Sequence, residues 1–220
     1  MKKIIIFGIS DFADQIFRYN KIEKTFDIEA FTVDREYCSV SEYCGIPVIP
    51  FDVAAAKYSP EDVEFLIAIG YQRMNDIRKN TFEKIKKLGF KTASFVHPSA
   101  IILTENIGEG NIILEGTVIG LDCCIGNCNI FKASTHISHD TTIGDFNYFS
   151  VSTSVAGEVV IRNNCFFGNN STTNDKISIA SYTLVGAGAY IAHDVKEEYG
   201  VYVPARTIRL ENKTSRDMKL

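Results

Sequence analysis

The stretch FKASTHISHDTTIGDFNYFSVSTSVAGEVVIRNNCFFG, residues 131–168, has a large apolar residue at every sixth position. The same phase runs from Ile101 to Ile191, where fifteen of the sixteen positions are apolar and Thr173 is the exception. A period of six fits neither an α-helix nor a simple alternating strand. It predicts the hexapeptide repeats of a parallel β-helix, in which three repeats make one triangular coil. Each inward side chain then contributes roughly 1.5–3 kcal/mol by its burial.

The residues before this region alternate apolar strands with amphipathic helices. A buried strand at residues 3–7 is followed by Gly8, by a helix from about Asp11 to Lys24, and by a strand that ends in Asp34. The same alternation continues to residue 96, with His97-Pro98 at the exit. We therefore expect a mixed α/β plus β chain: a small Rossmann-like α/β domain at 1–95, then a parallel β-helix with a C-terminal tail at 96–220.

The strand, turn, helix and second strand outline a nucleotide-binding unit. The helix N-terminus after Gly8 could hold a phosphate, and Asp34 could accept hydrogen bonds from a ribose or base. Only Gly8 remains of the usual glycine-rich turn, and Asp11 stands where a further glycine is expected. The alternative is that this domain only caps the β-helix.

The composition narrows the possible partners. A net charge of −4 and a pI near 5.6 indicate no nucleic-acid partner. The apolar run after Lys3 is too short for a signal peptide, and no run approaches a membrane span. The six cysteines form no disulfide pattern, so we expect reduced thiols and a cytoplasmic location. His136 and His139 lack an evident third ligand, so no metal site is predicted.

His139 is the strongest candidate for a catalytic side chain. It follows the inward Ile137 by two residues, so it should lie near a corner and point outward as a general base. Asp140 could orient the imidazole, although neighbours on a strand usually point apart. Gly157 lies one coil later and should stack beside His139, where its amide could stabilise an oxyanion. A solvated His-Asp pair and a corner glycine with positive φ are the alternatives.

Several motifs resemble one family, the bacterial sugar-nucleotide acetyltransferases of the PglD/NeuD type. The resemblance covers nearly the whole chain and is carried by His139–Phe146, Ala156-Gly157, Asn164–Gly168, Val185–Ala189 and Pro204-Ala205-Arg206. It implies a left-handed β-helix, a homotrimer with active sites between subunits, acetyl-CoA as co-substrate, and a nucleotide-activated amino sugar as acceptor.

The resemblance also implies roles for individual residues. His139 would be the general base, Asp140 its helper, and Gly157 the amide donor to the thioester oxygen. The remaining residues would form two binding sites: acetyl-CoA at Tyr148, Asn169, Gly186, Ala187 and Arg206, and the nucleotide at Gly8, Ser10, Asp11, Phe12 and Asp34. The sequence departs from the family at Asp11 and Tyr202, each in place of a glycine, and at Lys132, in place of an asparagine.

The expected function is acetyl transfer from acetyl-CoA to the amino group of a nucleotide-linked deoxysugar, with no acyl-enzyme. The alternatives are O-acetylation of a sugar hydroxyl and a non-catalytic nucleotide-binding scaffold. One flat coil wall cannot enclose a substrate, and contacts between copies must close into a ring or grow without limit, so we expect a homotrimer. The large residues His136, Phe146 and Tyr148 are expected to point outward into its interface.

Overall fold

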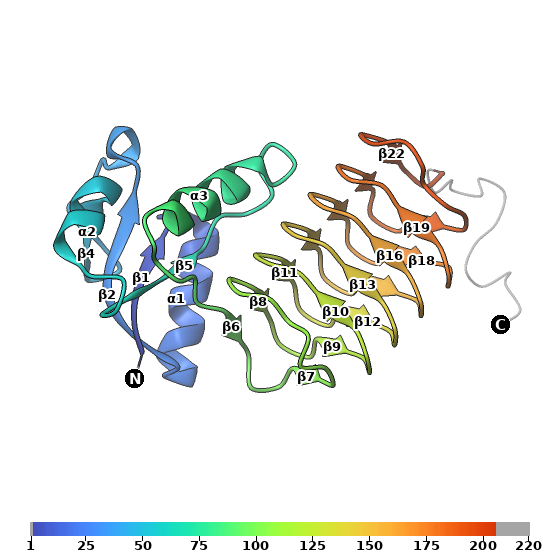
Figure 1. The fold of residues 1–220 in the computed structure, drawn as a ribbon, viewed down its shortest axis with the longest axis horizontal. Coiled ribbons are helices and arrows are strands. Elements are labelled where there is room, and N and C mark those ends of the chain that lie inside the picture. The colour runs from blue at the N-terminus through green and yellow to red at the C-terminus, as the bar shows by residue number, and fades with distance from the viewer. Residues whose placement is uncertain (1, 206–220) are drawn as a thin grey trace, which may run out of the picture.

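The computed structural model describes residues 2–205, which form an α/β domain and a stack of β-helical coils. Figure 1 shows the coils following one another away from the α/β domain. The helices and strands of the α/β domain are β1 (Lys2–Phe7), α1 (Asp11–Glu23), β2 (Phe26–Val33), the 3-10 helix η1 (Arg35–Tyr37), β3 (Glu42–Tyr43), β4 (Ile46–Pro50), α2 (Phe51–Lys57), β5 (Glu64–Ile67) and α3 (Asp76–Lys87).

The coils are built from strands of two residues each. In chain order these are β6 (Phe95–Val96), β7 (Ile101–Ile102), β8 (Ile112–Ile113), β9 (Val118–Ile119), β10 (Cys124–Ile125), β11 (Ile130–Phe131), β12 (His136–Ile137), β13 (Thr142–Ile143), β14 (Tyr148–Phe149), β15 (Ser154–Val155), β16 (Val160–Ile161), β17 (Phe166–Phe167), β18 (Thr172–Thr173), β19 (Ser178–Ile179), β20 (Leu184–Val185), β21 (Tyr190–Ile191) and β22 (Val201–Tyr202).

The sheet of the α/β domain has the strand order β3-β4-β2-β1-β5, and only the β3–β4 pair is antiparallel. The chain therefore moves from β1 to β2 and β4 on one side and returns to β5 on the other side of β1. Ligands of such sheets bind at the carboxyl ends of the strands, where the direction of progression reverses. The end of β1 is that point here.

The β-helical strands form three parallel sheets, one for each face of the triangular coil. We call β6, β8, β11, β14, β17, β20 and β22 the domain-facing sheet, β7, β9, β12, β15, β18 and β21 the second sheet, and β10, β13, β16 and β19 the third sheet. The predicted left-handed β-helix after a small α/β domain is confirmed. No helix within residues 2–205 is long and apolar enough to cross a membrane.

The inward positions of the repeat fill the core as the period predicts. The rings of Phe131, Phe149 and Phe167 stack one coil apart, with the centroids of successive rings 5.0 Å apart. The prediction was wrong for Ile101, which is 52% exposed. Its strand pairs Ile102 with Ile119, so the first coil is one residue short and Ile102 takes the inward place.

The α/β domain covers the outer side of the domain-facing sheet. Ile112, Ile130 and Tyr148 belong to the same buried cluster as residues of β1 and α1. The expectation that Phe146 and Tyr148 point into a subunit interface was wrong, because they are 7% and 8% exposed beneath this chain's own α/β domain. Residues 95–96 also pair with β8, so this strand is the first rung of the β-helix and not the last strand of the α/β sheet.

Candidate functional site

A cavity of about 540 Å³ opens at the carboxyl ends of β1, β2 and β5. Three of the residues expected to bind a nucleotide line it, namely Gly8, Ser10 and Asp34. Asp11 does not, and Phe12 instead faces the β-helix, where Lys132 Nζ lies 4.8 Å from the centre of its ring. The cavity is therefore at the predicted place in the fold but is formed by only part of the predicted set.

Gly8 allows β1 and β5 to approach each other at the floor of this cavity. Its φ is 128°, and a Cβ atom at this position would lie 2.8 Å from the carbonyl oxygen of Ala68. A larger residue would displace the backbone of both strand ends. Of the usual glycine-rich turn this chain keeps only Gly8, and Gly8 is the position at which the structure leaves no room for a Cβ atom.

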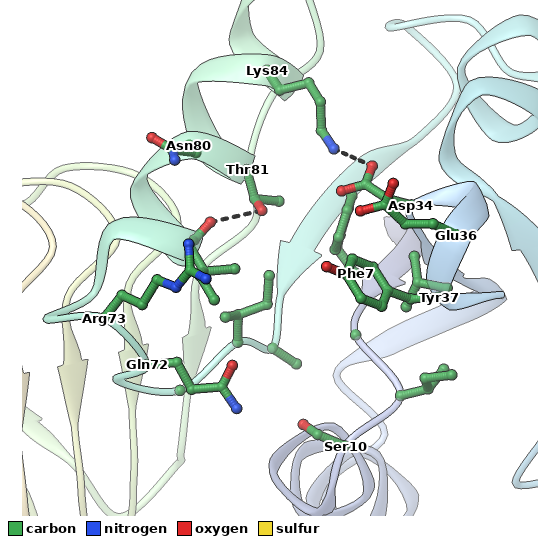
Figure 2. A pocket seen from close by; sticks show the side chains of 17 residues that line it. Phe7, Ser10, Asp34, Glu36, Tyr37, Gln72, Arg73, Asn80, Thr81 and Lys84 are labelled. Atoms are coloured by element: carbon green, nitrogen blue, oxygen red, sulfur yellow. Dashed lines mark hydrogen bonds and ion pairs between the residues drawn. The ribbon is translucent and has the colours of Figure 1, made fainter. Parts of the chain in front are cut away.

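Charged groups of both signs line the cavity, as Figure 2 shows. The ammonium of Lys84, on α3, forms an ion pair with the carboxylate of Asp34 at the end of β2. The same ammonium lies 4.9 Å from the ring centre of Phe7 and 4.6 Å from that of Phe51. Arg73 lines the wall formed by the loop after β5. Lys84 and Arg73 can thus neutralise an anionic ligand held beside Gly8.

His139 and Asp140 lie at the corner between the second and the third sheet. Their side chains meet, because His139 Nδ1 is 2.8 Å from Asp140 Oδ2. The expected divergence of neighbouring side chains is absent here because Asp140 is not in a strand: its φ is 56°, the left-handed conformation of the corner. An ionised carboxylate only accepts, so Nδ1 is the donor of this hydrogen bond, and in the neutral imidazole Nε2 keeps its lone pair.

Gly157 lies directly beneath the imidazole of His139. A Cβ atom on Gly157 would be 2.8 Å from both Nε2 and Cε1 of His139. The φ angle of Gly157 is not positive, whereas that of Glu158 is 58°, so close approach and not backbone conformation explains the glycine. The Gly157 amide has no hydrogen-bond partner within residues 2–205. A donor and a base thus lie side by side.

The one polar residue of the inward series supports this corner. The hydroxyl of Thr173 accepts a hydrogen bond of 3.0 Å from the amide of Ala156, the residue before Gly157. Thr173 is 6% exposed and belongs to the next coil. In the neighbouring coils the equivalent amide donates to the backbone carbonyl of the inward residue, as Ser138 does to Val155. At Thr173 the side-chain hydroxyl takes this hydrogen bond and holds the backbone that precedes Gly157.

The residues expected to bind acetyl-CoA lie on another edge. Asn169, Gly186 and Ala187 gather at the corner between the domain-facing and the second sheet, where the Asn169 carbonyl accepts from the Gly188 amide at 2.8 Å. Tyr148 is not with them, because it is buried against Tyr71 with ring centroids 5.0 Å apart. Burial raises its pKa to about 12, so its hydroxyl stays protonated. Arg206 lies outside the described residues.

Three groups of candidate residues thus occupy three different places. His139 lies at the corner opposite the domain-facing sheet, while the cavity lies in the domain that covers that sheet. In a triangular coil this corner is the point farthest from the opposite face. The cavity of one chain therefore cannot meet the imidazole of the same chain. Within the described residues, no cluster of three or more His, Cys, Asp or Glu side chains could hold a metal ion.

Sequence reasoning missed Lys84, Arg73 and Thr173. Lys84 lies on an amphipathic helix whose polar face carries several other lysines, and no pattern separates it from them. Thr173 had a signal, because it breaks an otherwise apolar series. The break in the apolar series marks Thr173 as an unusual position, but only the structure shows that its hydroxyl accepts a hydrogen bond from the Ala156 amide.

Comparisons with known proteins agree with both halves of the fold. Residues 3–85 match the family described as the PglD N-terminal domain. The acetyltransferase domain of PglB from Neisseria gonorrhoeae is 22% identical with a TM-score of 0.80, over 93% of this chain and 97% of that one. PerB from Caulobacter crescentus, solved with CoA and GDP-perosamine, is 22% identical with a TM-score of 0.79, over 93% and 95% of the chains.

A third solved structure, WeeI from Acinetobacter baumannii, is 22% identical with a TM-score of 0.76, over 89% of this chain and 93% of that one. At such identities the likeness establishes the fold of the whole chain. The resemblance noted in the sequence is confirmed to this extent: residues 3–85 match the PglD N-terminal domain family, and the whole chain has the fold of these three solved structures.

Proposed function

We propose that this protein is an acyltransferase that moves the acetyl group of acetyl-CoA to the amino group of a nucleotide-linked amino-deoxysugar. The observation that carries the proposal is the His139 imidazole, held by Asp140 with Nε2 close to Gly157, whose amide has no hydrogen-bond partner among residues 2–205. A base and an oxyanion donor side by side are what acyl transfer requires. The choice of substrates is supported by two of the similar proteins, since the PglB domain was solved with acetyl-CoA and PerB with CoA and GDP-perosamine.

The mechanism follows from these groups. The amine nitrogen attacks the thioester carbon, and His139 Nε2 takes the proton that the nitrogen loses. The carbonyl oxygen becomes an oxyanion and accepts a hydrogen bond from the Gly157 amide. When the tetrahedral intermediate collapses, the carbon–sulfur bond breaks and the CoA thiolate takes the proton from the imidazolium. Asp140 stabilises that imidazolium, and no group of the protein is acylated.

The site is shared between copies of the chain in this proposal. The cavity beside Gly8 binds the nucleotide, and the amino sugar extends from it to His139 of a neighbouring subunit. The separation of cavity and imidazole within one chain supports this arrangement. A contact between two different surfaces closes into a ring, and the proposed ring is a homotrimer. Acetyl-CoA lies between subunits, with Asn169, Gly186 and Ala187 contributed by one of them.

The test is an assay of free thiol release from acetyl-CoA with a panel of nucleotide sugars. The panel holds UDP-, GDP- and dTDP-linked 4-amino sugars and the matching hydroxy sugars. We expect an amino sugar to give turnover and His139→Ala to lower kcat by about 10²–10⁴. His193→Ala is the matched control, because His193 is exposed at the same corner three coils later.

Other outcomes would replace the proposal. Turnover with a hydroxy sugar only would make the protein an O-acetyltransferase. Nucleotide binding without any acetyl-CoA binding would make it a scaffold. Turnover of His139→Ala within about threefold of the wild type would remove the general-base role from this residue.

A further inference from the structure

Arg78 is the largest fully buried side chain of the described residues, and it has no carboxylate partner there. It lies in the first turns of α3 and is 1% exposed. Burial lowers the pKa of its guanidinium to about 10, so the group remains charged near neutral pH. A buried charge without an ion pair has to be held by other polar groups. Here those groups are all backbone carbonyl oxygens.

The carbonyls that hold Arg78 belong to two separate parts of the molecule. Nη1 donates to Gly70 at 2.7 Å and to Ile69 at 3.4 Å, at the end of β5, and both of these residues line the nucleotide cavity. On the β-helix, Nε donates to Cys128 at 2.9 Å, and Nη2 donates to Phe146 at 2.9 Å and to Asn147 at 3.0 Å. One side chain thus joins the cavity wall to two successive coils.

The segment before Arg78 continues this contact along the next two coils. Asn75 Nδ2 donates to the Cys165 carbonyl at 3.1 Å, and Asn164 Nδ2 donates to the Met74 carbonyl at 3.1 Å. The hydroxyl of Tyr182 donates to Asp76 Oδ1 at 3.0 Å. The corner residues Cys128, Phe146, Asn164 and Tyr182 are spaced one coil apart. Residues 74–78 therefore run along one edge of the β-helix.

The cavity wall between β5 and α3 has an unusual backbone. Arg73, Met74 and Asn75 have φ angles of 52°, 49° and 69°, three consecutive left-handed residues without a glycine. Such a conformation persists only where the surrounding structure imposes it. The bonds from Arg78, Asn75 and Asn164 are those constraints, and they are made to the β-helix. The wall would lose this shape without them.

We infer that Arg78 is a positioning residue that fixes the wall 69–73 of the nucleotide cavity on the β-helix and thereby sets the affinity for the nucleotide. The inference rests on the proposed function only for the identity of the ligand. Arginine suits the position because its planar group presents five donors in fixed directions, whereas a lysine ammonium could reach only one of the two groups of carbonyls.

The first test measures the wall itself and needs no ligand. Hydrogen–deuterium exchange of peptides covering residues 69–76 is compared between the wild type, Arg78→Met and Lys79→Met. Lys79 is the next residue of the same helix and does not line the cavity. We expect Arg78→Met to speed exchange of this segment at least about tenfold, with the β-helix peptides unchanged. Unchanged exchange of the segment would overturn the inference.

The second test measures the affinity. UDP, GDP and dTDP are titrated by calorimetry, and the one that binds is used with the variants. We expect Arg78→Met to weaken its binding at least about tenfold and Lys79→Met to leave it within about twofold, while acetyl-CoA affinity stays within about twofold in both. In turnover, KM for the nucleotide sugar should rise with kcat nearly unchanged. A general loss of folded protein would instead lower kcat and leave KM unchanged.

Two further variants keep the inference falsifiable. Arg78→Lys retains the positive charge but loses the planar group of five donors, so nucleotide affinity should stay as low as in Arg78→Met. Wild-type affinity in Arg78→Lys would show that the charge alone is sufficient and would overturn the inference. If Arg78→Met does not fold, Tyr182→Phe takes its place, because it removes only the hydrogen bond to Asp76 at the edge of the same contact. It should speed the exchange of residues 69–76 and weaken nucleotide binding, each by less than is expected for Arg78→Met. Failure of the wild type to bind any of the three nucleotides would contradict the proposed function, while the exchange experiment would still decide the role of Arg78.

Discussion

The contact between Gly157 and His139 is the smallest feature on which the proposed chemistry depends. Asp140 holds one ring nitrogen by a hydrogen bond, and the absence of a side chain at Gly157 lets the other nitrogen lie close to the backbone there. A displacement of about 1 Å in such an arrangement can reduce the rate about 10²-fold. The geometry can be perturbed here without disturbing the core, because His139 is more than half exposed.

Gly157→Ala should lower kcat by about 10²-fold, because the new methyl group would lie 2.8 Å from Nε2 and would push the ring away from the amide. Affinity for the nucleotide should be unchanged. Steady-state kinetics with thiol detection measures the effect, and Asp175→Ala, at the same corner position one coil later, is the control. A kcat within about threefold of the wild type would show that the imidazole does not act from this position.

The spacing of residues was enough to predict that His139, Asp140 and Gly157 lie together, because an 18-residue coil fixes which positions stack. It was not enough to predict the hydrogen bond between His139 and Asp140, which depends on the left-handed backbone of the corner. Lys84 could not be predicted, since its position in the cavity depends on how α3 packs over β1 and β2 and not on a local pattern.

At the level of the coil, the small residues inside the corners define the β-helix as much as the large inward ones. The hydroxyls of Thr135, Thr153 and Ser171 donate across their corners to backbone carbonyls at 2.6–2.8 Å. Cys123 and Cys165 occupy the same position with thiols and are fully buried. The six-residue period predicted small residues at these positions. It did not predict that the first coil is one residue short, which is visible only in the pairing of Ile102 with Ile119.

The buried thiol of Cys165 makes the coil sensitive to alkaline pH. Burial raises the pKa of this thiol from 9.0 to about 12. The unfolded chain therefore loses this proton above pH 9, while the folded chain keeps it. The stabilisation that the protonated thiol gives the folded state is complete below pH 9 and is lost as the pH rises towards 12. Each such group lowers the free energy of unfolding by about 1.4 kcal/mol per pH unit in this range.

Cys165→Ala should therefore show a shallower alkaline loss of stability than the wild type. Between pH 9.5 and pH 10.5 the difference in unfolding free energy between the two proteins should shrink by about 1.4 kcal/mol, as measured by urea unfolding. Cys124→Ala, which changes an exposed cysteine, should retain the wild-type slope. Parallel curves for wild type and Cys165→Ala would mean that this thiol does not remain protonated in the folded coil.

In the whole molecule, the α/β domain covers one of the three faces of the β-helix. The face that it covers decides whether its cavity lies near His139 of the same chain. The sequence predicted both parts but not the face, because each face carries the same repeat. Phe146 and Tyr148 were expected at a subunit interface for this reason, although they lie beneath the chain's own domain. With that face covered, His139 lies at the corner opposite the domain that holds the cavity, and the proposed shared site is the arrangement that would join them.

Mixed assemblies test this central claim most directly. A chain carrying His139→Ala and a chain carrying Ser10→Trp, which fills the cavity mouth, are co-expressed with different tags, and assemblies that contain both are isolated by two successive affinity steps. Each variant alone should be inactive. In a ring of three with shared sites, every mixed assembly contains one interface with an intact cavity and an intact histidine, so the account predicts about one third of the wild-type activity. A mixture as inactive as its parents would contradict it.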